Sequence, residues 1–215
     1  MNLTDEYPGI CMEKSLDAPL PPVVLPPGYT IRSIRVDEGA LWEQVMDKSY
    51  GGYGPGDFQK VMVENYDFDP SRVFLMFDES GEPCATATSW RQHYRWGPGI
   101  GYVLFVGVAS AYWGRGLGYM MTLHILHDFV EHGLNPAILE TNEPNLPALK
   151  TYLNLGFRPR LLAPYHTDRW EMIFAALKME PGDYPRDIRP PVDATHHPRP
   201  YPYEVWMQRE IAQGE

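Results

Sequence analysis

Three glycines at the start of a predicted helix are the residues of this chain most suited to binding a ligand. Gly114, Gly116 and Gly118 follow an apolar segment that ends near Val108, and Arg115 lies among them. Glycine lets the backbone approach a ligand closely and adopt positive φ. The free N–H groups of a helix's first turn, with the helix dipole, form an anion site suited to a pyrophosphate. The pattern therefore predicts a phosphate-binding loop, although glycines at a helix start also serve simply as turn residues.

Two common nucleotide motifs do not fit this loop. A P-loop requires Lys followed by Ser or Thr after the glycines, and neither pair is present here. A dinucleotide-binding fingerprint reads G-x-G-x-x-G near the first strand, whereas this loop reads G-x-G-x-G in mid-chain. The loop therefore indicates a different phosphate-bearing ligand.

A second informative segment, NLPALKTYLNLGF, begins at Asn145. Asn145 is placed to cap a helix, and Pro147 suits the first turn of that helix. Ala148 and Tyr152 are four residues apart and share one helix face. Gly156 is a plausible terminator. The segment therefore predicts a short helix that presents Tyr152.

Together the two segments resemble the GNAT superfamily of N-acetyltransferases. The superfamily's acetyl-CoA loop, R/Q-x-x-G-x-G/A, is matched by Trp113, Gly116 and Gly118, with Trp113 in place of Arg or Gln. Its later motif, N-x-x-A-x-x-x-Y-x-x-x-G-F, is matched in full between Asn145 and Phe157. The sequence around the two motifs is also similar to that of mycothiol synthase-like members. At Trp113 a side-chain contact to the pyrophosphate is lost, but backbone N–H groups supply most of such a site.

The resemblance implies acetyl-CoA as co-substrate and an amine as acceptor. It implies that Val106, Gly107 and Val108 form a splayed strand that pairs with pantetheine and offers an N–H to the thioester oxygen. It also implies cofactor contacts around the loop and the second motif, from Trp113, Gly114, Arg115, Gly116, Leu117, Gly118, Tyr119 and Asn145. Tyr152 is implied as the general acid, because a phenol with a pKa of about 10 can protonate a departing thiolate.

The general base and the acceptor site are left open. Glu140, at the end of a predicted strand, is the first candidate for the base, and Glu143 is the second. Either would need burial to raise its pKa. The aromatic loop from Tyr50 to Phe58 either covers the acceptor through its rings or packs on the core.

Three functions fit these observations. The first is acetyl transfer to a small-molecule amine. The second is acetyl transfer to a peptide or protein N-terminus, and the third is acyl-CoA sensing without catalysis. The fold class expected for all three is mixed α/β (α+β), with a mostly antiparallel sheet of six to seven strands and about four helices.

The periodicity of apolar residues predicts the elements that must position these groups. Strands are expected over residues 29–36, 73–77, 84–90, 102–108, 137–141, 157–163 and 170–177. Helices are expected over 41–50, 58–65, 116–133 and 145–155. Proline-rich stretches divide the chain into an N-terminal arm (1–28), an acetyltransferase domain (29–178) and a C-terminal arm (179–215), with a short helix or strand over 203–211. The arms could wrap the domain or a second subunit in a homodimer.

Composition narrows the partners and the compartment. The formal net charge is −10, which argues against a nucleic-acid partner and would attract a cationic acceptor. The two cysteines, Cys11 and Cys84, do not predict a disulfide framework or a zinc site, and His196-His197 lacks metal-ligand spacing. No metal is expected. The chain shows neither a signal peptide nor a membrane span, so a cytoplasmic location is expected.

Overall fold

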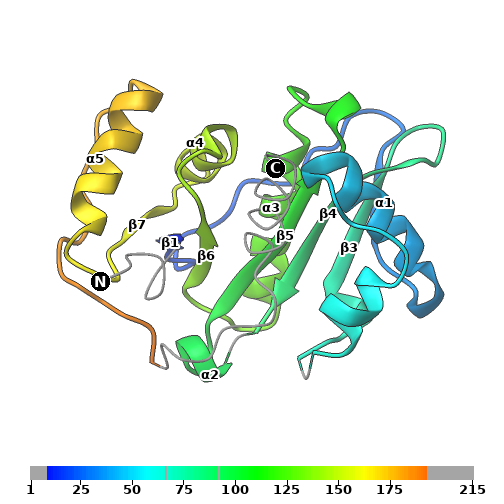
Figure 1. Cartoon of the computed structure of the whole chain (residues 1–215), viewed down its shortest axis with the longest axis horizontal. Helices are drawn as coiled ribbons and strands as arrows, with labels where there is room; N and C mark the ends of the chain where they lie inside the picture. Colours follow the sequence, from blue (N-terminus) through cyan, green and yellow to red (C-terminus); the bar gives the residue numbers. More distant parts are fainter. Residues whose placement is uncertain (1–8, 66, 92, 193–215) are drawn as a thin grey trace, which may run out of the picture. The chain divides into compact units, whose positions relative to one another are not determined.

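The computed structural model describes residues 9–65, 67–91 and 93–192 (Figure 1). Within these ranges seven strands form one sheet in the order β2-β3-β4-β5-β6-β1-β7. The β5–β6 pair is parallel, whereas β1–β6, β1–β7, β2–β3 and β3–β4 are antiparallel. The expected mixed, mostly antiparallel sheet of six to seven strands is therefore confirmed.

The elements have the following bounds. The strands are β1 (Ile10–Lys14), β2 (Thr30–Ser33), β3 (Val73–Phe77), β4 (Pro83–Trp90), β5 (Gly101–Val108), β6 (Ala137–Thr141) and β7 (Arg158–Arg160). The α-helices are α1 (Gly39–Tyr50), α2 (His93–Trp96), α3 (Leu117–Glu131), α4 (Leu146–Asn154) and α5 (His166–Leu177).

The described residues divide into two compact units. Unit 1 contains the chain up to Leu20, the segment Arg91–Val103 and the residues from Leu126 onward. Unit 2 contains Pro21–Trp90 and Leu104–Ile125.

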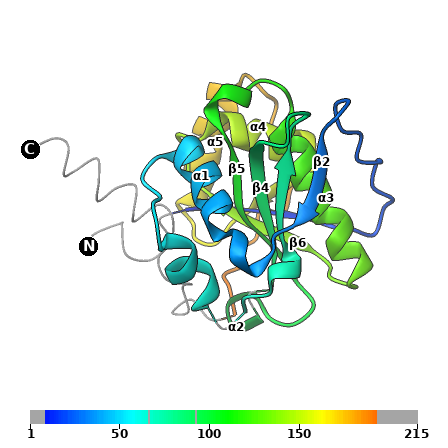
Figure 2. The same cartoon turned by 90° about the vertical axis from the view of Figure 1, so that its right-hand side faces the viewer.

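Unit 2 is built on β2, β3, β4 and the second half of β5. Every residue of β3 and β4 is buried, so both faces of these strands must be covered. Helix α1 packs against β4. On α3, His124 meets the Phe74 ring of β3 edge-on, with 4.6 Å between ring centroids. Figure 2 shows α1 and the start of α3 on either side of these strands.

Unit 1 is built on β6, β1 and β7, with α4 and α5 packed on each other. Strand β1 lies between β6 and β7, and its central residues pair with both neighbours: Cys11 is opposite Glu140 on one side and Arg160 on the other. This strand was not among those expected from the sequence. Its five residues precede the proline-rich stretch, and no regular element joins Lys14 to Thr30.

Three local predictions need correction. Residues 170–177, expected as a strand, belong to helix α5, whose buried residues His166, Trp170, Ile173 and Phe174 have helical spacing. The helix expected over 58–65 is a short π-helical turn, Gln59–Val63. Asn145 makes no side-chain capping bond; its carbonyl instead accepts from the Leu149 N–H at 3.0 Å.

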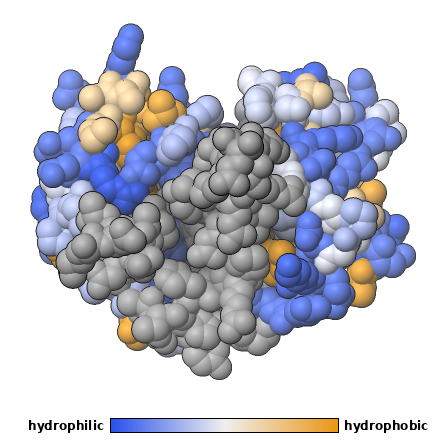
Figure 3. Space-filling model, viewed as in Figure 1, coloured by the Kyte–Doolittle hydropathy of each residue, from blue (hydrophilic) through white to orange (hydrophobic). Residues whose placement is uncertain are grey.

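Part of the C-terminal arm packs on unit 1. Tyr184 is buried beside the Phe174 ring, and Ile188 bridges to Leu161. The helix or strand expected over residues 203–211 and the His196-His197 pair lie outside the described residues. On the face drawn in Figure 3, the described surface is mostly hydrophilic with scattered apolar residues. None of the helices in the described ranges is long and apolar enough to cross a membrane.

Candidate functional site

The end of β5 in unit 2 is irregular at Phe105. This residue has a φ of +50°, the left-handed region that non-glycine residues rarely adopt. Its ring packs edge-on against Trp42, 5.3 Å between centroids, which offsets the local strain. Gly107, two residues later, allows α1 to approach: a Cβ there would lie 3.1 Å from the Met46 sulfur and 3.3 Å from the Ser49 hydroxyl. The absence of a side chain at Gly107 therefore permits the close approach of α1 to this strand.

Side chains hold the main-chain groups of the last β5 residues. The Tyr50 hydroxyl donates to the Val106 carbonyl. The Val108 N–H donates to the Ser49 hydroxyl at 3.1 Å, and the Val108 carbonyl accepts from the Trp113 indole N–H at 2.7 Å. Polar groups on this segment are therefore ordered by α1 on one side and by the following loop on the other.

The glycine loop follows directly. Gly114 and Gly116 have φ values of +77° and +75°, which only glycine adopts without strain. A Cβ on Gly114 would meet nothing within 4 Å, and one on Gly116 only the tip of Met120 at 3.9 Å. The first bond into α3 runs from the Met120 N–H to the Gly116 carbonyl, so earlier N–H groups of this turn have no acceptor within the helix. The loop presents an exposed, open cradle of main-chain donors.

Arg115 is held by its neighbours. Its guanidinium donates to the Tyr29 hydroxyl at 3.2 Å and to the Ala111 carbonyl at 3.3 Å, and it lies 5.0 Å from the centre of the Tyr112 ring. Tyr112 in turn donates to Asp78 at 2.6 Å. The Arg115 guanidinium is therefore engaged by neighbouring protein groups, whereas the donors that the loop itself exposes belong to the main chain.

The aromatic loop after α1 is mostly core. Tyr53 and Phe58 are buried against Trp42, with ring centroids 5.3 and 5.5 Å away. Tyr50 remains 38% exposed. Of the two alternatives for this loop, packing on the core holds for Tyr53 and Phe58.

In unit 1, Glu140 on β6 forms a buried ion pair. Its carboxylate accepts from the Arg95 guanidinium at 2.7 and 3.2 Å and from the Tyr102 hydroxyl at 3.0 Å. The side chains of Arg95 and Glu140 are 1% and 7% exposed. Such a bidentate pair fixes the position of both carboxylate oxygens.

Further charged residues surround this pair. Glu13 on β1 bonds Arg160 at 2.9 Å and Arg189 at 2.5 Å. The guanidiniums of Arg95 and Arg160 each lie 5.1 Å from the centre of the Trp96 ring. Burial, with the Glu140 charge as a second cause, raises the pKa of the nearby Cys11 thiol well above its usual value, so that thiol is protonated. No single stretch of sequence reveals this network, because its members come from six separate segments.

Tyr152 lies on α4, also in unit 1. It is 7% exposed, and its ring is 6.0 Å from that of Phe157 in an edge-on contact. Gly156 has a φ of +90° at the end of this helix, as expected for a terminator. Glu143, the second base candidate, pairs with Arg169. Burial, then the Arg169 charge, lowers the pKa of neighbouring His166 to about 4.

Comparison with known proteins places this arrangement in a family. Residues 40–157 match the family described as acetyltransferase (GNAT) family. A mycothiol acetyltransferase of Nocardia farcinica is 34% identical over 170 residues, which cover 73% of this chain and 53% of that protein. One of Mycobacteroides abscessus is 38% identical over 107 residues, covering 50% of this chain and 36% of its own length. The chain thus spans about half the length, or less, of these relatives.

Solved structures show the same fold. A GCN5-related N-acetyltransferase from Sphaerobacter thermophilus superposes with a TM-score of 0.57 at 20% identity, covering 71% of this chain and 48% of that one. A GNAT-family acetyltransferase from Colwellia psychrerythraea gives 0.55 at 13% identity, covering 70% and 52%. The family match covers more than half of the chain, and the chain belongs to the GNAT acetyltransferase family.

Proposed function

We propose that this chain transfers an acetyl group from acetyl-CoA to the amine of a small molecule. The observation that carries the proposal is the loop from Gly114 to Gly118, with two left-handed glycines and open space where side chains would be. Main-chain N–H groups at a helix start suit a pyrophosphate, so the residues present fit the co-substrate. Acetyl-CoA, when bound, supplies an activated acetyl thioester.

The names of the relatives and the net charge of the chain suggest which acceptor to test. Both relatives above carry the name mycothiol acetyltransferase, which makes a mycothiol-type amine the first acceptor to test. The formal charge of −10 favours the approach of a cationic amine over an anionic one.

Two side chains of unit 1 receive proposed roles. Tyr152, at the tyrosine position of the matched motif, would donate a proton to the departing thiolate. Both carboxylate oxygens of Glu140 accept hydrogen bonds, from Arg95 and Tyr102. That engagement supports Glu140 as an ordering residue for this region, in place of the base role first considered.

Calorimetry with acetyl-CoA tests the proposal. Wild-type protein should bind, and Gly116→Glu should weaken binding at least about 100-fold, because it adds bulk and negative charge at an anion site. Gly81→Glu is the matched control: Gly81 has a φ of +85° and open space around it, but it lies in the β3–β4 turn. The control should bind as wild type does.

Turnover is then measured as free-thiol release with a panel of amines. Transfer to a small amine supports the proposal. Tight binding without transfer to any amine or peptide would replace it with acyl-CoA sensing, and unchanged binding in Gly116→Glu would remove the loop from the site.

A further inference from the structure

Trp113 occupies the position at which the family's loop motif has Arg or Gln, and its indole N–H bonds the Val108 carbonyl at 2.7 Å. The indole is otherwise in an exposed position, 63% accessible to solvent. An exposed tryptophan in a polar loop has no apolar burial to explain it. The indole N–H bond to Val108 is a specific polar contact of this exposed side chain.

The bond connects two parts of the proposed cofactor site. Val108 is the last residue of β5, and Gly114 follows Trp113 directly. Between them the chain makes a single 3-10 turn, Ser110–Tyr112, closed by the Tyr112 N–H to the Ala109 carbonyl at 2.8 Å and the Trp113 N–H to the Ser110 carbonyl at 3.2 Å. The indole bond spans this turn and fixes the start of the glycine loop relative to the strand end.

Arg, Gln and Trp share one property relevant here. Each carries an N–H donor near the end of a long side chain, whereas Phe, Leu and Met do not. Each of these three side chains can therefore donate a hydrogen bond to the carbonyl five residues earlier in the chain. Their different charges and shapes are irrelevant to that contact.

We propose that Trp113 is a positioning residue that ties the phosphate loop to β5 through the Val108 carbonyl, and that position 113 requires a side-chain N–H donor. In this role the side chain orders the loop before the ligand arrives. A preordered loop binds more tightly because less conformational entropy is lost on binding. The inference rests on the proposed function, since it concerns the same acetyl-CoA site.

Four variants test the positioning role of Trp113 by calorimetry with acetyl-CoA and by steady-state kinetics. Trp113→Phe keeps an aromatic ring and deletes the donor, so the Kd should rise about three- to tenfold. The KM for acetyl-CoA should rise similarly while kcat stays within about twofold, because only binding is affected. Trp113→Gln and Trp113→Arg restore a donor and should recover most of the wild-type affinity.

The fourth variant, Tyr112→Phe, is the matched control in the same turn. It removes the bond to Asp78 and leaves the Trp113–Val108 contact in place, so its Kd should stay within about twofold of wild type. An equal loss in this control would overturn the proposal, because the effect would then come from general loosening of the turn.

Other outcomes are equally decisive. Unchanged affinity in Trp113→Phe would show that the bond does not order the loop. Tighter binding in that variant would mean that the indole blocks the strand end and must leave before the ligand binds, which also overturns the proposal. If wild-type protein itself fails to bind acetyl-CoA, the proposed function fails instead, and the two failures are thereby distinguished.

Discussion

The two units hold their polar groups in different ways. In unit 2 the polar groups near the end of β5 belong to the main chain: the N–H groups of an exposed loop, and two carbonyls that accept hydrogen bonds from Tyr50 and Trp113. In unit 1 the polar groups are charged side chains, and the pair Arg95–Glu140 is almost fully buried. The conformation of an exposed loop is set by its own residues, whereas a buried ion pair is stable only when every partner is present. The consequences of mutation should differ accordingly.

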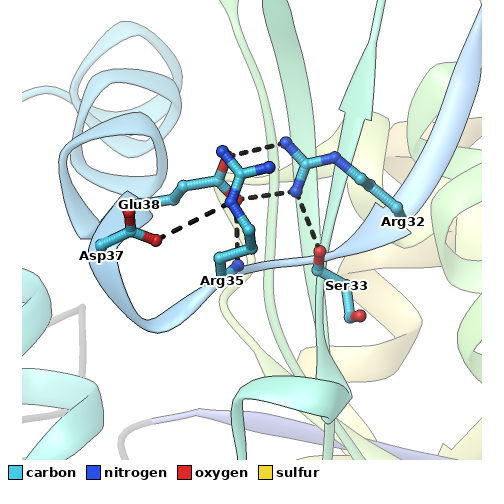
Figure 4. Close-up of polar contacts among 5 residues, drawn as sticks. All are labelled: Arg32, Ser33, Arg35, Asp37 and Glu38. Atoms are coloured by element: carbon cyan, nitrogen blue, oxygen red, sulfur yellow. Dashed lines mark hydrogen bonds and ion pairs between the residues drawn. The ribbon is translucent and has the colours of Figure 1, made fainter.

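Figure 4 shows how unit 2 arranges its own charged side chains. Glu38, at the start of α1, accepts two bonds from Arg32, at 2.7 and 2.8 Å, and pairs with Arg35 at 2.6 Å. Both arginines are substantially exposed, 40% and 68%. The Glu38 side chain itself is 8% exposed, but both of its arginine partners reach the solvent, in contrast to the enclosed Arg95–Glu140 pair of unit 1. Ion pairs with solvent-exposed partners contribute little to stability.

The largest expected effect concerns a side chain of unit 1. Tyr152→Phe keeps the ring that packs on Phe157 and deletes the hydroxyl, so kcat should fall about 10²- to 10⁴-fold if the phenol is the proton donor. Acetyl-CoA affinity should change little. Tyr184→Phe, a buried tyrosine outside the matched motif, is the control and should keep the wild-type kcat. A wild-type rate in Tyr152→Phe, with chemistry shown to be rate-limiting, would make Tyr152 a packing residue.

The second prediction compares the ion pairs directly. Arg95→Ala leaves Glu140 buried without its partner and should lower the free energy of unfolding by about 3–5 kcal/mol. Arg35→Ala removes an exposed partner of Glu38 and should cost less than about 1 kcal/mol. Urea denaturation of both variants measures the difference. Equal losses would show that burial does not separate the two units.

The third prediction concerns the dependence of stability on pH. Burial, followed by the Arg169 charge, lowers the pKa of His166 to about 4, against a usual value near 6.5. As pH falls below about 6.5 the unfolded chain gains a proton that the folded chain does not bind until about pH 4. The neutral histidine therefore stabilises the fold above pH 6.5. A contribution on the order of 1–3 kcal/mol is lost between those values.

Glu38 should affect the free energy of unfolding at a lower pH than His166 does. The Arg32 hydrogen bond is the main reason why its pKa falls to about 2, from a usual 4.5. Its contribution is present above about pH 4.5 and is lost as pH approaches 2; because the partners are exposed, it should be about 1 kcal/mol or less. Urea denaturation between pH 7 and 2.5 measures both contributions. The free energy of unfolding should depend less on pH between 6.5 and 4 in His166→Gln, and less on pH below 4.5 in Glu38→Gln. The reverse assignment would contradict both causes.

Local signals predicted much of the fold. The strands over 73–77 and 137–141 agree with β3 and β6, and the glycine loop and the end of α4 at Gly156 follow their expected chemistry. Apolar periodicity and glycine conformation depend on near neighbours in sequence, which explains that agreement. The strand prediction for residues 170–177 was wrong because the apolar residues of WEMIFAAL are compatible with the period of a strand or of a helix. Packing around Trp170 selects the helix.

The sequence by itself determined the family, the order of most elements and the loop that resembles a phosphate site, since each is encoded within a few tens of consecutive residues. Only the tertiary structure decided that Ile10–Lys14 pairs between β6 and β7, and that Arg95 and Tyr102 converge on Glu140. It also decided that the Trp113 indole bonds Val108. Pairings between distant segments must offset a large loss of chain entropy through burial of the whole core, so no short stretch of sequence can specify them.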